Sequence, residues 1–127
     1  EINGSTEKPG KCKEVKGLKN IDKIITQIKK NRPLAKIYLE SIYPVNDTNN
    51  SKIDHSMVHN RKNEDIKAIN KMIKKIAKDE KIIYIDMYSL LEDSDENMKI
   101  EYTKEGLHMS GEGYKVITKT LKEYLSK

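Results

Sequence analysis

Apolar residues recur at helical spacing in three segments of the chain. The first segment follows Asn20, a plausible N-cap, and stops at Pro33, which cannot continue a helix. The second follows Asn63, another possible cap, and turns lysines outward, while the third begins near Ser110. The apolar positions are Ile21, Ile24, Ile25 and Ile28, then Ile66, Ile69, Ile73 and Ile76, then Tyr114, Ile117, Leu121, Tyr124 and Leu125. The sequence therefore predicts three amphipathic helices, each with one face in the core.

Two short runs rich in β-formers lie between these helices and are predicted as strands, the first of them buried. They are residues 35–43, which stop at Pro44, and residues 81–86. The stretches without a period are predicted as loops: residues 1–16, 45–62 and 87–104. Strands that alternate with amphipathic helices predict an α/β fold with a parallel sheet flanked by helices. In such sheets, functional residues gather in the loops that leave the carboxyl ends of the strands.

One of these loops carries an acid and a histidine at a spacing that suits catalysis. Glu105 precedes His108 by three residues, with Gly106 between them and Gly111 after them, just before the last predicted helix. At this spacing the carboxylate can orient the imidazole and stabilise the imidazolium that forms when the ring accepts a proton. His108 is therefore the candidate general base.

Three segments carry a family resemblance, in order along the chain. They are residues 36–46, which end in Pro-Val-Asn, residues 83–91, and residues 102–114, which contain Glu-Gly-Leu-His. Together they resemble the SGNH (GDSL-type) esterases and acylhydrolases. The resemblance implies a flavodoxin-like three-layer sandwich and a serine ester hydrolase of acylhydrolase, acetylesterase or lipase type that needs no cofactor. It also implies that Glu105, one methylene longer than the family's usual Asp, is the triad acid beside His108.

Two blocks of this family have no counterpart in the sequence, namely the Gly-Asp-Ser nucleophile block and the oxyanion-hole glycine block. Asn3 is the one candidate remnant of the family's Gly-x-Asn-Asp block. Residues 1–127 are therefore expected to be the C-terminal part of a single SGNH-like domain, inactive alone and partnered by the N-terminal half. The expected substrate is a small ester, either an acylated sugar or a short-chain acyl ester. The alternative is a non-catalytic SGNH-like binding module or a split fragment, and self-association into a homo-oligomer is a further possibility.

The net charge of the chain does not change the expectation of an ester hydrolase. Twenty-five Lys and Arg against 20 Asp and Glu give a net charge of +5, but the lysines are mixed with acids over the predicted helix faces. This pattern favours a solvated surface over a nucleic-acid binding site, which usually uses more arginine and interleaved aromatic residues. No run approaches the ~18 apolar residues of a membrane span. The compartment stays open, with both cytoplasmic and secreted locations compatible with the sequence.

The other residues that could bind a metal or act in catalysis are predicted to have no such role. His55 and His59 lie four residues apart in a polar stretch without a third ligand, so solvated side chains are favoured over a metal site. The carboxylates lack the regular spacing of a calcium loop and are predicted to form a solvated turn; they are Glu92, Asp93, Asp95 and Glu96. The single Cys12 is predicted to be a free thiol without a catalytic role.

Overall fold

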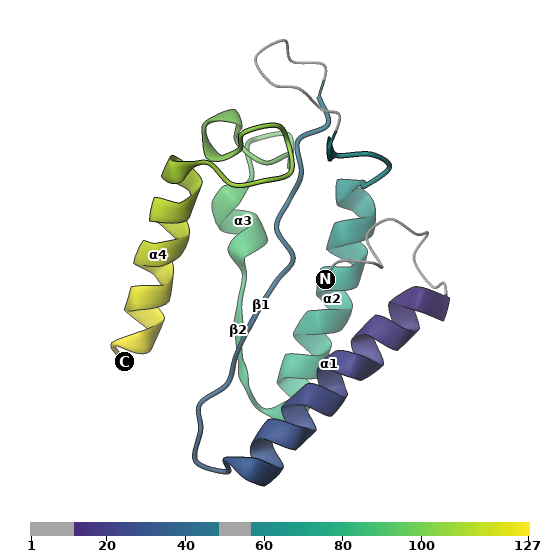
Figure 1. Cartoon of the computed structure of the whole chain (residues 1–127), viewed down its shortest axis with the longest axis vertical. Helices are drawn as coiled ribbons and strands as arrows, with labels where there is room; N and C mark the ends of the chain where they lie inside the picture. Colours follow the sequence, from purple (N-terminus) through teal and green to yellow (C-terminus); the bar gives the residue numbers. More distant parts are fainter. Residues whose placement is uncertain (1–11, 49–56) are drawn as a thin grey trace. The chain divides into compact units, whose positions relative to one another are not determined.

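The computed structural model describes residues 12–48 and 57–127, with side chains described from residue 17 onward (Figure 1). These residues divide into two compact units. The first, here called the sheet unit, comprises residues 12–42 and 64–86. The second, here called the histidine unit, comprises residues 43–48, 57–63 and 87–127.

The sheet unit contains two parallel strands and two long helices. Helix α1 (Cys12–Asn31) precedes β1 (Tyr38–Glu40), and helix α2 (Asn63–Glu80) precedes β2 (Ile83–Ile85). The strands run side by side in Figure 1 and pair in parallel, with Tyr38 opposite Ile83. The predicted α/β architecture with a parallel sheet is therefore confirmed, although both strands are shorter than predicted.

The beginning of α1 was wrongly predicted. The helix starts at Cys12, so residues 12–16 are not loop and Asn20 lies inside the helix rather than at its N-cap. Residues 12–16 contain two lysines and a glutamate and so resemble a polar loop, although Val15 and Leu18 lie three residues apart, as on one face of a helix. The predicted end at Pro33 agrees with the last helical residue, Asn31. Of the isoleucines, Ile25 is buried, whereas Ile24 is 59% exposed.

Helix α2 matches its predicted pattern closely. Ile66, Ile69 and Ile73 are buried as expected. Asn70 is also buried, and its side-chain amide accepts a hydrogen bond from the Ile42 N–H at 2.7 Å and donates one to the Ile42 carbonyl at 3.0 Å. Both polar ends of this amide are thus satisfied inside the sheet unit, as burial requires.

The histidine unit contains three shorter elements: α3 (Met87–Leu91), the 3₁₀ helix η3 (Ile100–Tyr102) and α4 (Gly111–Leu125). The prediction of one irregular stretch over residues 87–104 was therefore wrong at α3 and η3. The described core of this unit is apolar and rich in methionine: Val45, Val58, Met87, Tyr88, Leu91, Met98, Met109 and Ile117. Neither this core nor that of the sheet unit contains Phe or Trp, because the sequence has none.

Helix α4 begins where the sequence predicted, but its predicted apolar face is only partly buried. Ile117 is 6% exposed, whereas Tyr114 is 58% and Leu125 is 67% exposed, so their assignment to the core was wrong. Helix α4 contacts η3 and α3 in this unit. Since these short elements cover only part of one face, periodicity alone overestimated how much of the helix is buried. No helix within residues 12–48 and 57–127 is both long enough and apolar enough to cross a membrane.

Candidate active site

The loop that carries Glu105 and His108 is closed at its base by paired backbone. Thr103 and Met109 form an isolated antiparallel bridge, and the Lys104 N–H donates to the His108 carbonyl at 3.0 Å. One step further out, the Ser110 N–H donates to the Tyr102 carbonyl at 2.9 Å. The acid and the histidine therefore lie within a tight turn whose two ends are hydrogen-bonded to each other.

The carboxylate of Glu105 folds back over this turn and uses both of its oxygens. Oε1 accepts hydrogen bonds from the Leu107 N–H at 3.1 Å and from the His108 N–H at 2.5 Å. Oε2 lies 2.8 Å from Nδ1 of the His108 ring. The extra methylene of Glu relative to Asp thus does not prevent contact with the imidazole, because the side chain curls back along its own loop.

Hydrogen bonding makes Glu105 a stronger acid than an ordinary glutamate. Desolvation by burial is the largest single influence and raises the pKa of Glu105. The hydrogen bonds from the His108 N–H, the His108 ring and the Leu107 N–H outweigh it together, so the pKa lies below its ordinary value. The carboxylate is therefore ionised near neutral pH and acts as an acceptor only.

This partner fixes the state of the histidine ring. An ionised carboxylate accepts a hydrogen bond, so Nδ1 carries the hydrogen and Nε2 keeps the lone pair of the neutral ring. Within the described part of the chain, no side chain is hydrogen-bonded to Nε2. The side chain of His108 is 60% exposed, against 22% for Glu105. The arrangement presents a basic nitrogen to solvent while the opposite nitrogen is held by an anion.

Gly106 lets the loop lie against a segment that follows β1. Its φ is +98°, a conformation that favours glycine. A Cβ added to Gly106 would lie 2.4 Å from the carbonyl oxygen of Asn46 and 2.8 Å from Cγ2 of Val58. The Asn46 N–H donates to the Gly106 carbonyl at 2.8 Å in the same contact. Any larger residue at this position would displace the loop.

The side chain of Asn46 in turn anchors that segment. It is 1% exposed, and its Nδ2 donates to the Met98 carbonyl at 2.7 Å. Its Oδ1 accepts from the N–H of Thr48 at 3.0 Å and from the hydroxyl of Thr48 at 2.5 Å. The sequence placed Asn46 in a Pro-Val-Asn turn but assigned it no role. Its link to the loop sixty residues later is a non-local contact that the turn motif does not indicate.

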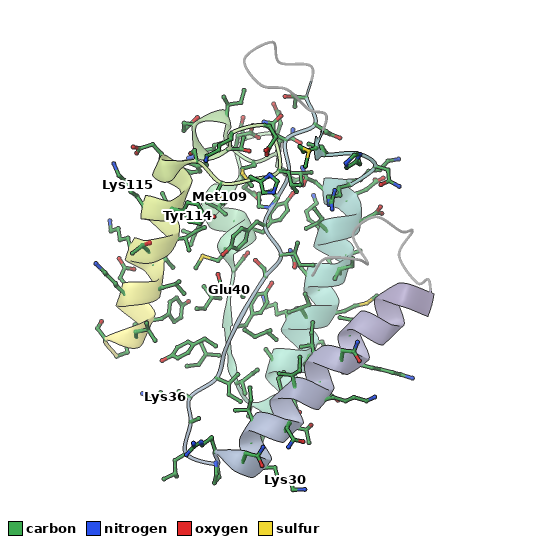
Figure 2. The ribbon with its side chains drawn as sticks, viewed as in Figure 1. Lys30, Lys36, Glu40, Met109, Tyr114 and Lys115 are labelled. Atoms are coloured by element: carbon green, nitrogen blue, oxygen red, sulfur yellow. The ribbon has the colours of Figure 1, made fainter. Side chains whose placement is uncertain are left out.

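Ser110 ends the loop and starts α4. Its hydroxyl accepts from the Gly113 N–H at 3.3 Å, as an N-cap does, and donates to the Glu101 carbonyl at 2.6 Å. A Cβ on Gly113 would lie 2.3 Å from Cε of Met109, so the first turn of α4 packs closely on the loop. Figure 2 labels Met109 just before α4 and Tyr114 in its first turn. The hydroxyl of Ser110 thus uses its donor and an acceptor position in hydrogen bonds that stabilise the start of α4.

The remaining candidates lie away from this loop or outside the described residues. Asn3 and His55 lie outside them, as does the side chain of Cys12. His59 is exposed in a turn, with a φ of 55°. Asp93 accepts the N–H groups of Asp95 and Asn97 on one carboxylate oxygen, which explains the acidic stretch as a turn. Among residues 12–48 and 57–127, no group of three His, Cys, Asp or Glu side chains is arranged to hold a metal ion.

Comparison with known proteins gives a consistent picture. The model of the GDSL-like lipase/acylhydrolase family matches residues 3–116 of the chain. Among solved structures, a protein of Streptococcus pneumoniae described as a candidate platelet activating factor has a TM-score of 0.81 and 32% identity. That match covers 88% of this chain and 51% of the other. No curated protein matches significantly.

Two further structures share the fold at lower identity. A GDSL-like lipase of Bacteroides thetaiotaomicron has a TM-score of 0.77 at 24% identity, and an acylhydrolase of Bacteroides fragilis has the same TM-score at 23% identity. Each match covers 99% of this chain and 58% of the other chain. The chain thus spans between half and three-fifths of the length of these structures, and the predicted fold class is confirmed.

Proposed function

Because the chain belongs to the GDSL-like lipase/acylhydrolase family, as its three matching segments predicted, we propose that it supplies the histidine and the acid of a serine ester hydrolase. His108 is the general base and Glu105 is the acid that orients it. The observation that carries this proposal is the 2.8 Å contact between Glu105 Oε2 and His108 Nδ1, with Nε2 on the opposite side of an exposed ring. This is the geometry that a proton shuttle requires.

The proposed reaction has two halves. A serine hydroxyl attacks the ester carbonyl carbon while its proton passes to Nε2 of His108, and Glu105 stabilises the resulting imidazolium. The tetrahedral intermediate then expels the alcohol, which takes the proton from Nε2, and leaves an acyl-serine. In the second half, Nε2 removes a proton from water as the water attacks the acyl carbon. Collapse of that intermediate releases the carboxylic acid and returns the proton to the serine.

The nucleophile is proposed to come from outside residues 1–127. The sequence has no Gly-Asp-Ser block, and Ser110, the serine nearest to His108 along the chain, holds a helix N-cap. The oxyanion donors are assigned to the same missing blocks, with Asn3 as the candidate remnant in this chain. The partner is therefore the N-terminal half of the same fold, either upstream in one polypeptide or as a separate chain. The two together are here called the assembled protein.

The proposed substrate is a small ester, either an acylated sugar or a short-chain acyl ester. The exposed ring of His108 suits a reaction at a surface-accessible carbonyl. The described groups supply acid–base chemistry from a carboxylate and an imidazole, for which ester hydrolysis needs no organic cofactor.

The proposal is tested by replacing His108 with Ala in the assembled protein. Hydrolysis of p-nitrophenyl acetate should fall on the order of 10³-fold or more, while the thermal unfolding transition is retained. The matched control is His59→Asn, which alters an exposed histidine in the same unit and keeps a residue that tolerates a positive φ. The control should hydrolyse the ester at the unaltered rate.

The alternative function, a non-catalytic SGNH-like binding module, gives a different outcome in the same experiment. A folded assembled protein that neither hydrolyses esters nor reacts with a fluorophosphonate probe would support the binding module. Normal turnover by a folded His108→Ala variant would instead remove His108 from the mechanism while leaving ester hydrolysis in place.

A further inference from the structure

Thr103 places its hydroxyl inside the loop that carries Glu105 and His108. The residue is 5% exposed and sits at the start of the loop, where it pairs with Met109. Its Oγ1 accepts a hydrogen bond from the Gly106 N–H at 2.9 Å and donates one to the His108 carbonyl at 2.8 Å. One hydroxyl at the start of the loop is therefore bonded both to Gly106, in the middle of the loop, and to His108, near its end.

The two bonds involve backbone groups that determine where the site residues point. Gly106 is the residue whose left-handed conformation turns the chain between Glu105 and His108. His108 is bound at both ends of its backbone. Its carbonyl accepts the bond from Thr103, while its N–H and its ring are bound by Glu105. With the Gly106 N–H and the His108 carbonyl both bonded to Thr103, the N–H groups of Leu107 and His108 are restricted in direction. These are the N–H groups that donate to the Glu105 carboxylate.

We infer that Thr103 is a positioning residue that holds the Glu105–His108 pair in its working geometry through its hydroxyl. The inference rests on the proposed function of that pair. The role requires a single buried atom that both donates and accepts, which the oxygen of a hydroxyl does. Valine has nearly the same shape and can do neither, so it leaves the Gly106 N–H without this partner where solvent is excluded.

The test compares Thr103→Val with Thr103→Ser in the assembled protein. Thr103→Val should lower kcat on the order of 10²-fold with little change in KM, since misplacing a catalytic group affects the chemical step more than binding. Thr103→Ser keeps both hydrogen bonds and should restore most of kcat. A Thr103→Val variant that folds with unaltered kcat would overturn the inference, as would a serine variant as impaired as the valine variant.

Two spectroscopic readouts separate this inference from the proposed function. The ¹⁵N signals of the His108 ring report its tautomer, and Thr103→Val should convert the Nδ1–H form into a mixture of both tautomers. This readout stays valid even if His108→Ala shows that the histidine is not catalytic. If Thr103→Val does not fold, hydrogen exchange of the Gly106 amide in the unaltered protein decides instead. Protection of that amide supports the inference, and exchange at the rate of a free loop amide overturns it.

Discussion

The carboxylate of Glu105 binds both the backbone and the ring of His108, through different oxygens of the same group. Oε1 accepts the His108 N–H at 2.5 Å and Oε2 contacts Nδ1 at 2.8 Å. An acid that binds only the ring leaves the direction of the loop to other groups. Here the same anion binds the peptide and the imidazole together, so the acid orients the ring and its own loop at once.

The first prediction concerns the charge of that anion. In the assembled protein, Glu105→Gln should lower ester hydrolysis much further than Glu105→Asp. Glutamine keeps the shape but cannot stabilise the imidazolium, whereas aspartate keeps the charge and is the usual residue of the family. For Gln the expected loss is on the order of 10³-fold. Steady-state kinetics of both variants decide the point, and equal activities would show that Glu105 serves only to shape the loop.

The second prediction concerns the pH dependence of stability. The pKa of Glu105 is lowered in the folded state, so its ionised form favours folding. That contribution to stability is fully present at pH values above the ordinary glutamate pKa of 4.5. It is lost as the pH falls through the lower pKa that Glu105 has in the folded state. Glu105→Gln should therefore be less stable than the unaltered protein at pH 7, with a difference that shrinks as the pH falls below 4.5.

Urea unfolding of both proteins at pH 7, 5 and 3 measures this difference. Glu112→Gln is the control, because Glu112 makes an exposed ion pair with Lys115 at 3.0 Å. Such pairs contribute little to stability, so the control should differ from the unaltered protein by less than about 1 kcal/mol at each pH. A Glu105→Gln difference that does not change with pH would contradict the assignment of its hydrogen bonds.

The third prediction concerns the close approach of the loop to Asn46. Gly106→Ala places a Cβ 2.4 Å from a backbone oxygen and forces a side chain into a φ of +98°. The free energy of unfolding should fall by about 1–3 kcal/mol from backbone strain alone. Gly111→Ala is the matched control, since an added Cβ there meets no atom within 4 Å apart from its chain neighbours and the backbone of its own helix. That variant should be neutral or stabilised by up to about 1 kcal/mol in a thermal melt.

The parts of the fold that the sequence predicted are those set by local rules. The isoleucine face of α2, the stop before Pro33 and the start of α4 near Ser110 follow from spacing and backbone chemistry within a few residues. The first turns of α1 escaped prediction because residues 12–16 are mostly polar, with Val15 as their one aliphatic side chain. The exposure of Tyr114 escaped it because burial depends on which elements pack against α4, a non-local property.

The same division applies to the candidate site. The spacing of Glu105 and His108 predicted that they could meet, because they lie in one turn. The contact between Asn46 and Gly106 joins segments that are distant in sequence, and the roles of both Thr103 bonds depend on how the loop closes. A sequence pattern indicates which groups are available, whereas these hydrogen bonds depend on the packing of the whole unit.

The last prediction concerns residues 1–127 by themselves. This chain alone should hydrolyse p-nitrophenyl acetate no faster than its own His108→Ala variant. The reason is chemical, because a base and an acid without a serine nucleophile have no route to an acyl-enzyme. Adding the Gly-Asp-Ser-bearing segment of the family should restore turnover that depends on His108.

Sedimentation velocity tests the structural side of the same prediction. The two described strands of the sheet unit form a two-stranded sheet, and such a small sheet gains stability from further strands or covering elements. The isolated chain should therefore self-associate, and should become a defined complex when the serine-bearing segment is present. A monomer with a sharp thermal transition, or ester hydrolysis that depends on a serine within residues 1–127, would show that the chain functions without that partner.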